Sequence, residues 1–226
     1  MKRILPTFIL IGILISCKKV DQTNNTSQEP VSTETMSIDS TSNAVTISFK
    51  AIDTDEALIA TALMAAPKES REDCTVIGYN MSGEFVTFKE GTNALICMVD
   101  DPKRDGFNAA CYHKDLEPFM ARGRALRAEG KTEQEIFDIR EAEMKSGQLK
   151  ITPGTTLNIY YGSNTTYDPE TYEVEGAQRR YVVYIPWATS ETTGLPESPD
   201  VPNDPWIMNP GTHRAHIMLM PPPNKE

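Results

Sequence analysis

The chain has few of the residue types and motifs that usually mark a chemical activity. It contains three histidines, four cysteines and two tryptophans in 226 residues. It has no nucleophile elbow, no phosphate-binding glycine-rich loop, no His-Glu-x-x-His motif, no paired Cys-x-x-Cys motif and no calcium loop. We therefore predict no cofactor and no metal. Whether the chain is an enzyme stays open, with a non-catalytic role favoured.

Positive charge is also scarce. Lys and Arg number 22 against 32 Asp and Glu, which gives a formal net charge of −10 and an isoelectric point near 4.9. This balance excludes a nucleic-acid partner and an electrostatic hold on anionic lipid, because both need a basic surface. The acidic excess is typical of a soluble protein body.

Long hydrophobic runs are missing everywhere except at the start of the chain. Lys2 and Arg3 precede an almost wholly apolar stretch from Ile4 to Ile15, which has the length of a signal-peptide core rather than the ~20 residues of a membrane-spanning helix. The stretch ends in Leu14-Ile15-Ser16-Cys17, which resembles the bacterial lipobox. We predict cleavage before Cys17 and attachment of diacylglycerol to its sulfur, with further acylation, such as palmitate, at the new amine. The alternatives are a cleaved secreted protein or an uncleaved anchor, in which Cys17 is incidental.

These features predict three regions of the chain and its cellular location. Residues 1–16 are the lipoprotein signal peptide, 17–44 are the lipidated Cys17 and a disordered Ser/Thr-rich tether, and 45–226 are one domain. Lys18 is not an acidic inner-membrane retention signal, so we expect a lipid anchor in the outer membrane. The body of the protein would then lie in the periplasm or at the cell surface.

The pattern of the body predicts a single α+β domain with a largely antiparallel sheet and helices packed on it. Expected helices run from Asp55 to Ala66 with Asp53 as cap, from Asp115 to about Glu129, and from a Thr132–Glu135 capping box to about Ser146. Expected strands include an antiparallel meander, and a long Pro-rich loop is expected over 187–211. The strands are predicted around 45–50, 74–79, 84–89, 93–99, 157–161, 181–186 and 215–220.

Lipidation of Cys17 leaves three other cysteines, Cys74, Cys97 and Cys111. In an oxidising compartment we predict a disulfide between Cys97 and Cys111 across a turn-rich loop, worth about 3 kcal/mol in the chain-entropy model. Cys74 opens an apolar run and is interpreted as a buried thiol. Pairing of Cys74 with either of the others remains an alternative.

The candidate site residues are histidines and tryptophans near the C-terminal end. His216, between apolar neighbours, is the candidate acid/base residue of a hydrolase. His213 and His216 could share a metal only if the segment around His213 curls and a third ligand such as His113, Asp100 or Asp101 joins them. Trp187 and Trp206 flank the Pro-rich loop and could line a groove for a glycan or a peptide by stacking.

Several short motifs together resemble a family of uncharacterised exported bacterial proteins. They are Ala60-Thr61-Ala62-Leu63, Ala65-Ala66-Pro67, Gly91-Thr92-Asn93, Cys97 with Cys111, Gly194-Leu195-Pro196 and Ala215-His216-Ile217-Met218. The resemblance implies the Cys97–Cys111 pairing and brings no catalytic residues, because the family has no assigned activity. Cys74 and the long charged segment 122–145 depart from the family pattern.

The sequence thus predicts a lipid-anchored protein of the cell envelope that acts as a non-catalytic binding or interaction module. Its expected partners are the membrane, through the lipid anchor, and an envelope protein or a glycan. The alternative is an envelope hydrolase that uses His216 with an acidic partner.

Overall fold

The computed structural model describes residues 48–222. The predicted signal peptide, Cys17, the tether and the first part of the predicted strand at 45–50 lie outside the described residues. The described residues belong to one compact unit. No helix in this part of the chain has the length and apolar character needed to cross a bilayer.

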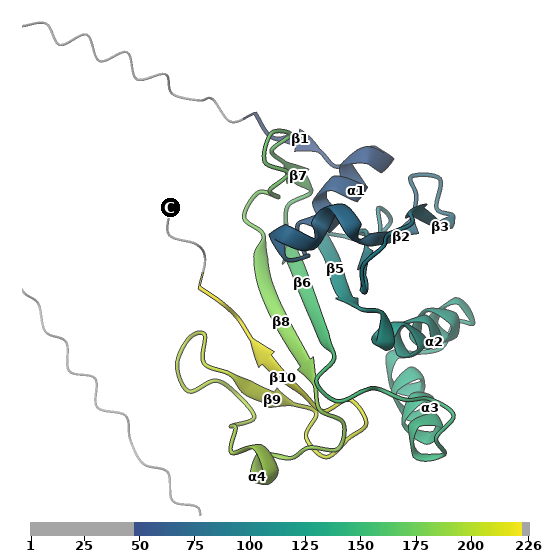
Figure 1. Cartoon of the computed structure of the whole chain (residues 1–226), viewed down its shortest axis with the longest axis vertical. Coiled ribbons are helices and arrows are strands. Elements are labelled where there is room, and N and C mark those ends of the chain that lie inside the picture. Colours follow the sequence, from purple (N-terminus) through teal and green to yellow (C-terminus); the bar gives the residue numbers. More distant parts are fainter. Residues whose placement is uncertain (1–47, 223–226) are drawn as a thin grey trace, which may run out of the picture. The chain divides into compact units, whose positions relative to one another are not determined.

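Eight strands form the main sheet, in the order β3-β2-β4-β5-β6-β8-β10-β9. All neighbouring pairs are antiparallel except β2 and β4. This confirms the predicted α+β class with a largely antiparallel sheet (Figure 1). The strands of this sheet are β2 (Thr75–Tyr79), β3 (Phe85–Lys89), β4 (Leu95–Met98), β5 (Phe107–His113), β6 (Thr156–Gly162), β8 (Gln178–Tyr184), β9 (Trp206–Met208) and β10 (His216–Leu219). Two further short strands, β1 (Lys50–Ala51) and β7 (Thr166–Tyr167), pair with each other.

Helices cover the sheet on its two faces. On one face, α1 (Asp55–Leu63) and the segment after it pack against β2, β4, β5 and β6. On the other face, the segment that enters α2 (Glu117–Ala128) contributes to a second core with residues of β5, β6, β8 and β10. Figure 1 shows α2 together with α3 (Glu133–Lys145) beside the sheet, away from α1. The remaining helical segments are η1 (Lys68–Asp73), η2 (Lys114–Leu116) and α4 (Ser190–Thr193).

The ends of the helices follow local side-chain chemistry. The Thr132–Glu135 capping box forms as predicted, with each partner bonding the other's backbone, and Gly147 follows the end of α3 in a left-handed conformation. At α1 the predicted cap was wrong: Thr54, and not Asp53, accepts a hydrogen bond from the backbone N–H of Ala57. The helix starts one residue later than a cap at Asp53 requires.

The meander predicted for β2, β3 and β4 was partly wrong. β2 and β3 form the antiparallel hairpin, but β4 then crosses to the other edge of β2 and pairs with it in parallel. The crossing brings Gly91 against the backbone of the residues just before β2. A Cβ at Gly91 would lie 2.2 Å from the backbone N of Thr75 and 2.3 Å from the carbonyl O of Asp73. Glycine is therefore the only residue that lets this connection pass so close.

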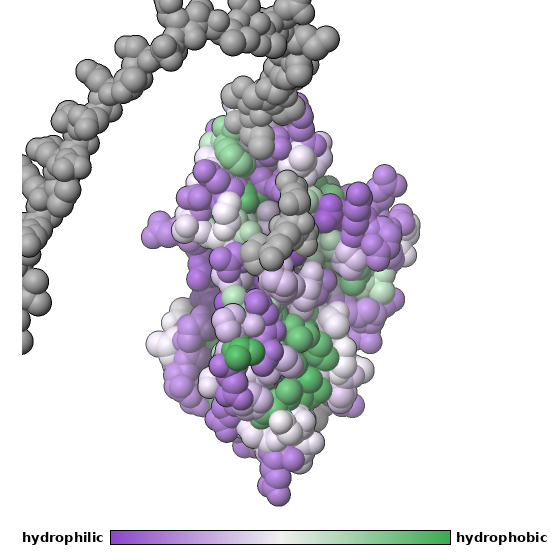
Figure 2. Space-filling model, turned by 90° about the vertical axis from the view of Figure 1, so that its left-hand side faces the viewer, coloured by the Kyte–Doolittle hydropathy of each residue, from purple (hydrophilic) through white to green (hydrophobic). Residues whose placement is uncertain are grey.

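Some elements were not foreseen. β5 was missing from the expectations, because Phe107–His113 is buried on both faces and lacks a clear polar/apolar alternation. The Pro-rich segment 187–211 was predicted to be a loop, but it contains α4 and β9 and is held by backbone hydrogen bonds. Figure 2 views the molecule from the side of β8, β9 and β10, and apolar residues gather in the lower half of that view.

Candidate functional site

An amphipathic groove lies between α2 and the sheet. It has a volume of about 420 Å³, within the range of small-molecule sites. Residues from β2–β6, from the β4–β5 loop and from α2 line it. The lining residues with large apolar or charged side chains, together with Ala110, are Tyr79, Phe85, Met98, Asp100, Asp101, Arg104, Met120, Arg124, Arg127, Leu157 and Ile159.

The floor of the groove follows from strand periodicity. Met98 is paired with Ala110, and Ala110 is paired with Ile159 across three adjacent strands. Side chains of paired residues point to the same face of a sheet, and their chain neighbours point to the other. The floor is therefore a continuous apolar row, while the adjacent Cys97 and Cys111 belong to the opposite face.

The wall of the groove is one face of α2. Met120, Arg124 and Arg127 follow one another at helical i, i+4, i+7 spacing. The guanidinium of Arg124 lies 5.0 Å from the centroid of the Phe85 ring and forms an ion pair with Glu117. Glu117 also accepts a 2.6 Å hydrogen bond from the hydroxyl of Tyr112. These contacts fix Arg124 at the mouth of the groove.

Asp100 is the polar residue of the groove with the most unusual environment. It is only 6% exposed, and its Oδ1 accepts a 2.9 Å hydrogen bond from the backbone N–H of Asn108. Burial raises the pKa of Asp100 to about 6, although hydrogen bonds from backbone N–H groups act in the opposite direction. No ion pair of Asp100 exists among the described residues. The groove therefore carries a buried carboxylate that forms no ion pair within this part of the chain, although the charge of Arg104 acts on it and opposes the rise in pKa.

His216, the candidate acid/base residue, is surrounded by groups that hold its ring in place. It is buried, its Nδ1 lies 2.7 Å from the carbonyl O of Arg214, and its ring packs beside Tyr184. Burial lowers the pKa of His216, and the charges of Arg214 and Arg180 lower it further, while the bond to the Arg214 carbonyl opposes this. No carboxylate bonds to this ring within residues 48–222. The acidic partner that a hydrolase would need is absent there.

The histidine that does meet a carboxylate is His213. Its Nδ1 lies 3.2 Å from Oε2 of Glu141 on α3, and its ring packs against Phe137 and Phe119. The residue is 0% exposed, and its Nε2 has no hydrogen-bond partner in the structure. An imidazole without exposed surface cannot meet a substrate, so we interpret the His213–Glu141 pair as structural. No potential metal-binding group in the described part of the chain includes a histidine.

The two tryptophans have different surroundings. Trp206 packs against the core on the α2 side of the sheet. Trp187 is 40% exposed, and Nζ of Lys145 lies 5.8 Å from the centroid of its ring. Neither residue lines the α2 groove.

The three described cysteines are all free and buried. Cys74 is a buried thiol, as predicted. Cys97 and Cys111 face each other in the β4–β5 register, but the predicted disulfide is not formed in the structure. Cys74 lies close to both, so the three sulfurs form one group. Hydrogen bonds among the three thiols lower the pKa of Cys74 and raise that of Cys97.

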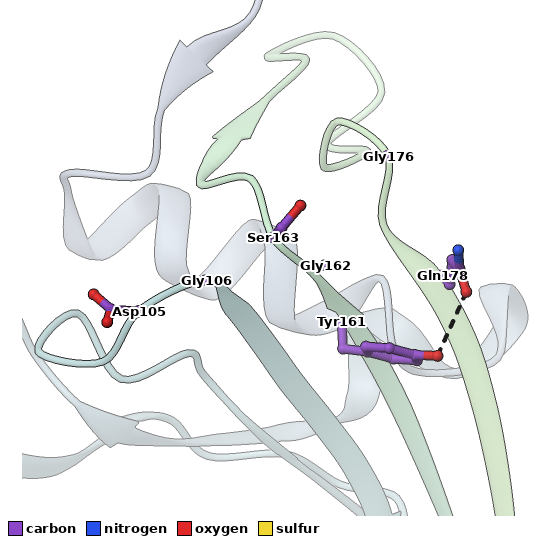
Figure 3. Close-up of a pocket in the computed structure, with 7 residues that line it drawn as sticks. All are labelled: Asp105, Gly106, Tyr161, Gly162, Ser163, Gly176 and Gln178. Atoms are coloured by element: carbon purple, nitrogen blue, oxygen red, sulfur yellow. Dashed lines mark hydrogen bonds between the residues drawn. The ribbon is translucent and has the colours of Figure 1, made fainter. Parts of the chain in front are cut away.

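A second hollow, at the end of β5 and β6, is a weaker candidate (Figure 3). Three of its seven lining residues are glycines, and of the side chains drawn only those of Tyr161 and Gln178 meet. The hydroxyl of Tyr161 and Oε1 of Gln178 are 3.5 Å apart, while Asp105 lies on the other side. Its polar groups do not converge on a common point, as those of a binding site do.

The sequence did not single out Arg124, Glu141 or the groove itself. The spacing of Met120, Arg124 and Arg127 on one helix face was a usable signal, as was the strand-ending Asp100. Glu141 and His213 are 72 residues apart, and only the tertiary structure brings them together. Comparisons of the chain with protein-family models, with curated proteins and with solved structures give no match.

Proposed function

We propose that this chain is a lipid-anchored protein of the bacterial cell envelope that binds a small ligand in the α2 groove without catalysing a reaction. The lipobox-like Leu14-Ile15-Ser16-Cys17 supports the anchor. The surroundings of His216 do not favour the hydrolase alternative, because its ring nitrogen bonds a backbone carbonyl and not a carboxylate.

The observation that carries the binding role is the unpaired Asp100 carboxylate at the edge of an apolar groove. Keeping a carboxylate buried without an ion pair costs free energy, which is why its pKa is raised. A ligand that brings a positive charge to Asp100 recovers this free energy. The apolar row of Met98, Ala110 and Ile159 then holds an apolar body of modest size.

The chemistry of the groove therefore fits an amine with an apolar side chain. The amino end of a short apolar peptide belongs to this class, and an envelope protein partner could supply it. Arg104, Arg124 and Arg127 also line the groove, and they can hold a carboxylate or carbonyl further along the ligand.

The test uses the full chain in detergent and two probes, phenylalanine amide and its N-acetylated form. We expect saturable binding of the amine by calorimetry at neutral pH and at least about tenfold weaker binding of the acetylated probe, since one charge-assisted hydrogen bond is worth 1.5–3 kcal/mol. Affinity should also fall below about pH 6, where Asp100 becomes protonated.

The variant Asp100→Asn should bind both probes equally weakly. Asp204→Asn, which makes the same charge change at an exposed position between α4 and β9, should bind like the wild type. Equal affinity of the wild type for the two probes, or no binding of either one, would refute the proposal. Preferential binding of neutral oligosaccharides would refute the choice of ligand class.

A further inference from the structure

Three cysteine sulfurs converge in the core beneath α1. The Sγ atoms of Cys74, Cys97 and Cys111 all lie within 4.8 Å of one another, and none of the three residues is more than 1% exposed. Their neighbours in this core include Leu58, Ala62 and Tyr160. The described part of the chain contains no other group of three His, Cys, Asp or Glu side chains close enough to share an ion.

The sheet itself brings the three sulfurs together. Cys97 on β4 lies opposite Cys111 on β5 and beside Val76 on β2. Cys74 precedes Val76 by two residues, so it points to the same face of the sheet. The unusual parallel pairing of β2 with β4 is therefore what adds the third thiol to the cross-strand pair.

The connection between β3 and β4 holds Cys74 in place. Gly91 lies against the backbone of residues 73–75, and the backbone N–H groups of Thr92 and Asn93 both donate to the carbonyl O of Asp73. The side-chain amide of Asn93 lies 2.9 Å from the carbonyl O of Ser70 and 3.7 Å from Sγ of Cys74. Such hydrogen bonds to a sulfur and its neighbours are typical of the outer shell of a thiolate metal site.

From this arrangement we propose that Cys74, Cys97 and Cys111 form a three-coordinate thiolate site for a soft monovalent metal ion of the Cu(I) class. A metal–sulfur distance of about 2.3 Å in a planar trigonal site places the sulfurs about 4.0 Å apart. Separations of up to 4.8 Å reach this value with sulfur movements of a few tenths of an ångström. Rotation about the side-chain torsions supplies such movements.

The number and type of the ligands select the ion. Thiolates favour soft ions such as Cu(I) and Zn(II). Structural zinc almost always takes four ligands, and no fourth His, Cys, Asp or Glu joins the cluster among the described residues. The site is closed to solvent, so water is not at hand as a fourth ligand. An ion that is satisfied by three sulfurs therefore fits best.

Binding needs no redox step. The ion enters as Cu(I) and stays Cu(I), three metal–sulfur bonds form, and each bound thiol releases its proton to solvent. Nζ of Lys89 and the guanidinium of Arg71 are the cations whose fields reach the cluster, and they offset part of its negative charge. Because the site is buried, we expect loading during folding and slow exchange afterwards.

The experiment refolds the full chain without oxygen in the presence of Cu(I), and in parallel with Zn(II), against a chromogenic chelator. We expect one Cu(I) per chain, a thiolate-to-metal charge-transfer band, a higher melting temperature and three sulfur neighbours at about 2.3 Å by X-ray absorption. All of these are measured on the wild type, so they do not depend on whether variants fold.

Serine at any one of the three positions should lower the affinity for Cu(I) by about 100-fold or more, since even outer-shell changes cost 10–100-fold. Cys17→Ser, a cysteine outside the cluster, should leave affinity and stoichiometry unchanged. The proposal is overturned if the wild type binds no Cu(I), if it binds Zn(II) in its place, or if the triple serine variant binds Cu(I) equally well. A Cys97–Cys111 disulfide in protein isolated from cells would overturn it too, because two of the three ligands would be lost.

Discussion

Asp100 gives the sharpest test of the physical reasoning, through the variant Asp100→Asn. The carboxylate is 6% exposed and hydrogen-bonded by the backbone N–H of Asn108. An asparagine side chain has the same shape, can accept the same hydrogen bond through its oxygen, and never carries a charge. The variant therefore removes the cost of the buried charge and leaves the contacts in place.

The magnitude follows from the raised pKa. A change from 3.8 to about 6 is roughly two pKa units, which corresponds to about 3 kcal/mol at 1.36 kcal/mol per unit. The folded protein binds the proton more tightly than the unfolded chain does, so the stability tied to this group is complete below about pH 4. It is lost as pH rises through about 6. Asp100→Asn should thus equal the wild type near pH 4 and exceed it by about 2–3 kcal/mol at pH 8.

Urea unfolding of both proteins at several pH values between 4 and 8 measures this difference, with Asp204→Asn as the exposed control of equal charge change. The control should follow the wild-type curve within about 0.5 kcal/mol, as surface changes usually do. A stability difference that does not grow with pH, or a variant that is less stable at pH 8, would contradict the account of Asp100. If Asp100→Asn is more stable than the wild type but no longer binds the amine, Asp100 lowers the stability of the fold and is needed for binding.

The remaining predictions concern the anchor, one glycine and one buried histidine. Cys17→Ser should abolish labelling by a palmitate analogue and release the chain from the membrane fraction; labelling that persists would contradict the lipobox interpretation. Gly91→Ala should destabilise the fold by about 3 kcal/mol, because its Cβ meets backbone atoms. In urea unfolding Gly130→Ala should cost less, since nothing lies within 4 Å of its Cβ and only its left-handed backbone (φ +79°) is strained. Burial lowers the pKa of His216, so the unfolded chain takes up a proton that the folded one resists, and stability falls as pH drops below about 6.5. His216→Gln should weaken this acid destabilisation in thermal melts at pH 5 and 7, whereas the partly exposed His113→Gln should not.

The parts of the fold that could be predicted depend on short-range chemistry. The Thr132–Glu135 box acts over three residues, and the strand around 84–89 is marked by its own β-forming residues, so both were recognised. β5 was missed because a strand buried on both faces looks like any other apolar run. The parallel placement of β4 was missed because it depends on Gly91 lying against the backbone of another segment.

The site was harder to predict than the fold. Asp100 was weighed only as a metal ligand, because its burial depends on tertiary contacts such as the hydrogen bond from the backbone N–H of Asn108 on β5. The apolar neighbours of His216 predicted that it is buried, and this is confirmed. The histidine that lies next to a carboxylate is His213, which contacts Glu141. Sequence patterns report what a residue is and which way it points along its own element. They do not report which distant residue it meets.

By itself the sequence determined the α+β class and the presence of a buried thiol at Cys74, and it predicts a lipid anchor at Cys17. These follow from local patterns: a charged and apolar leader, the order of helical and extended periodicities, and an apolar run. Only the tertiary structure decided that Cys74 joins Cys97 and Cys111 and that Asp100 closes an apolar groove. Both depend on strands and helices far apart in the chain, because packing of the two faces of one sheet sets the distances between them.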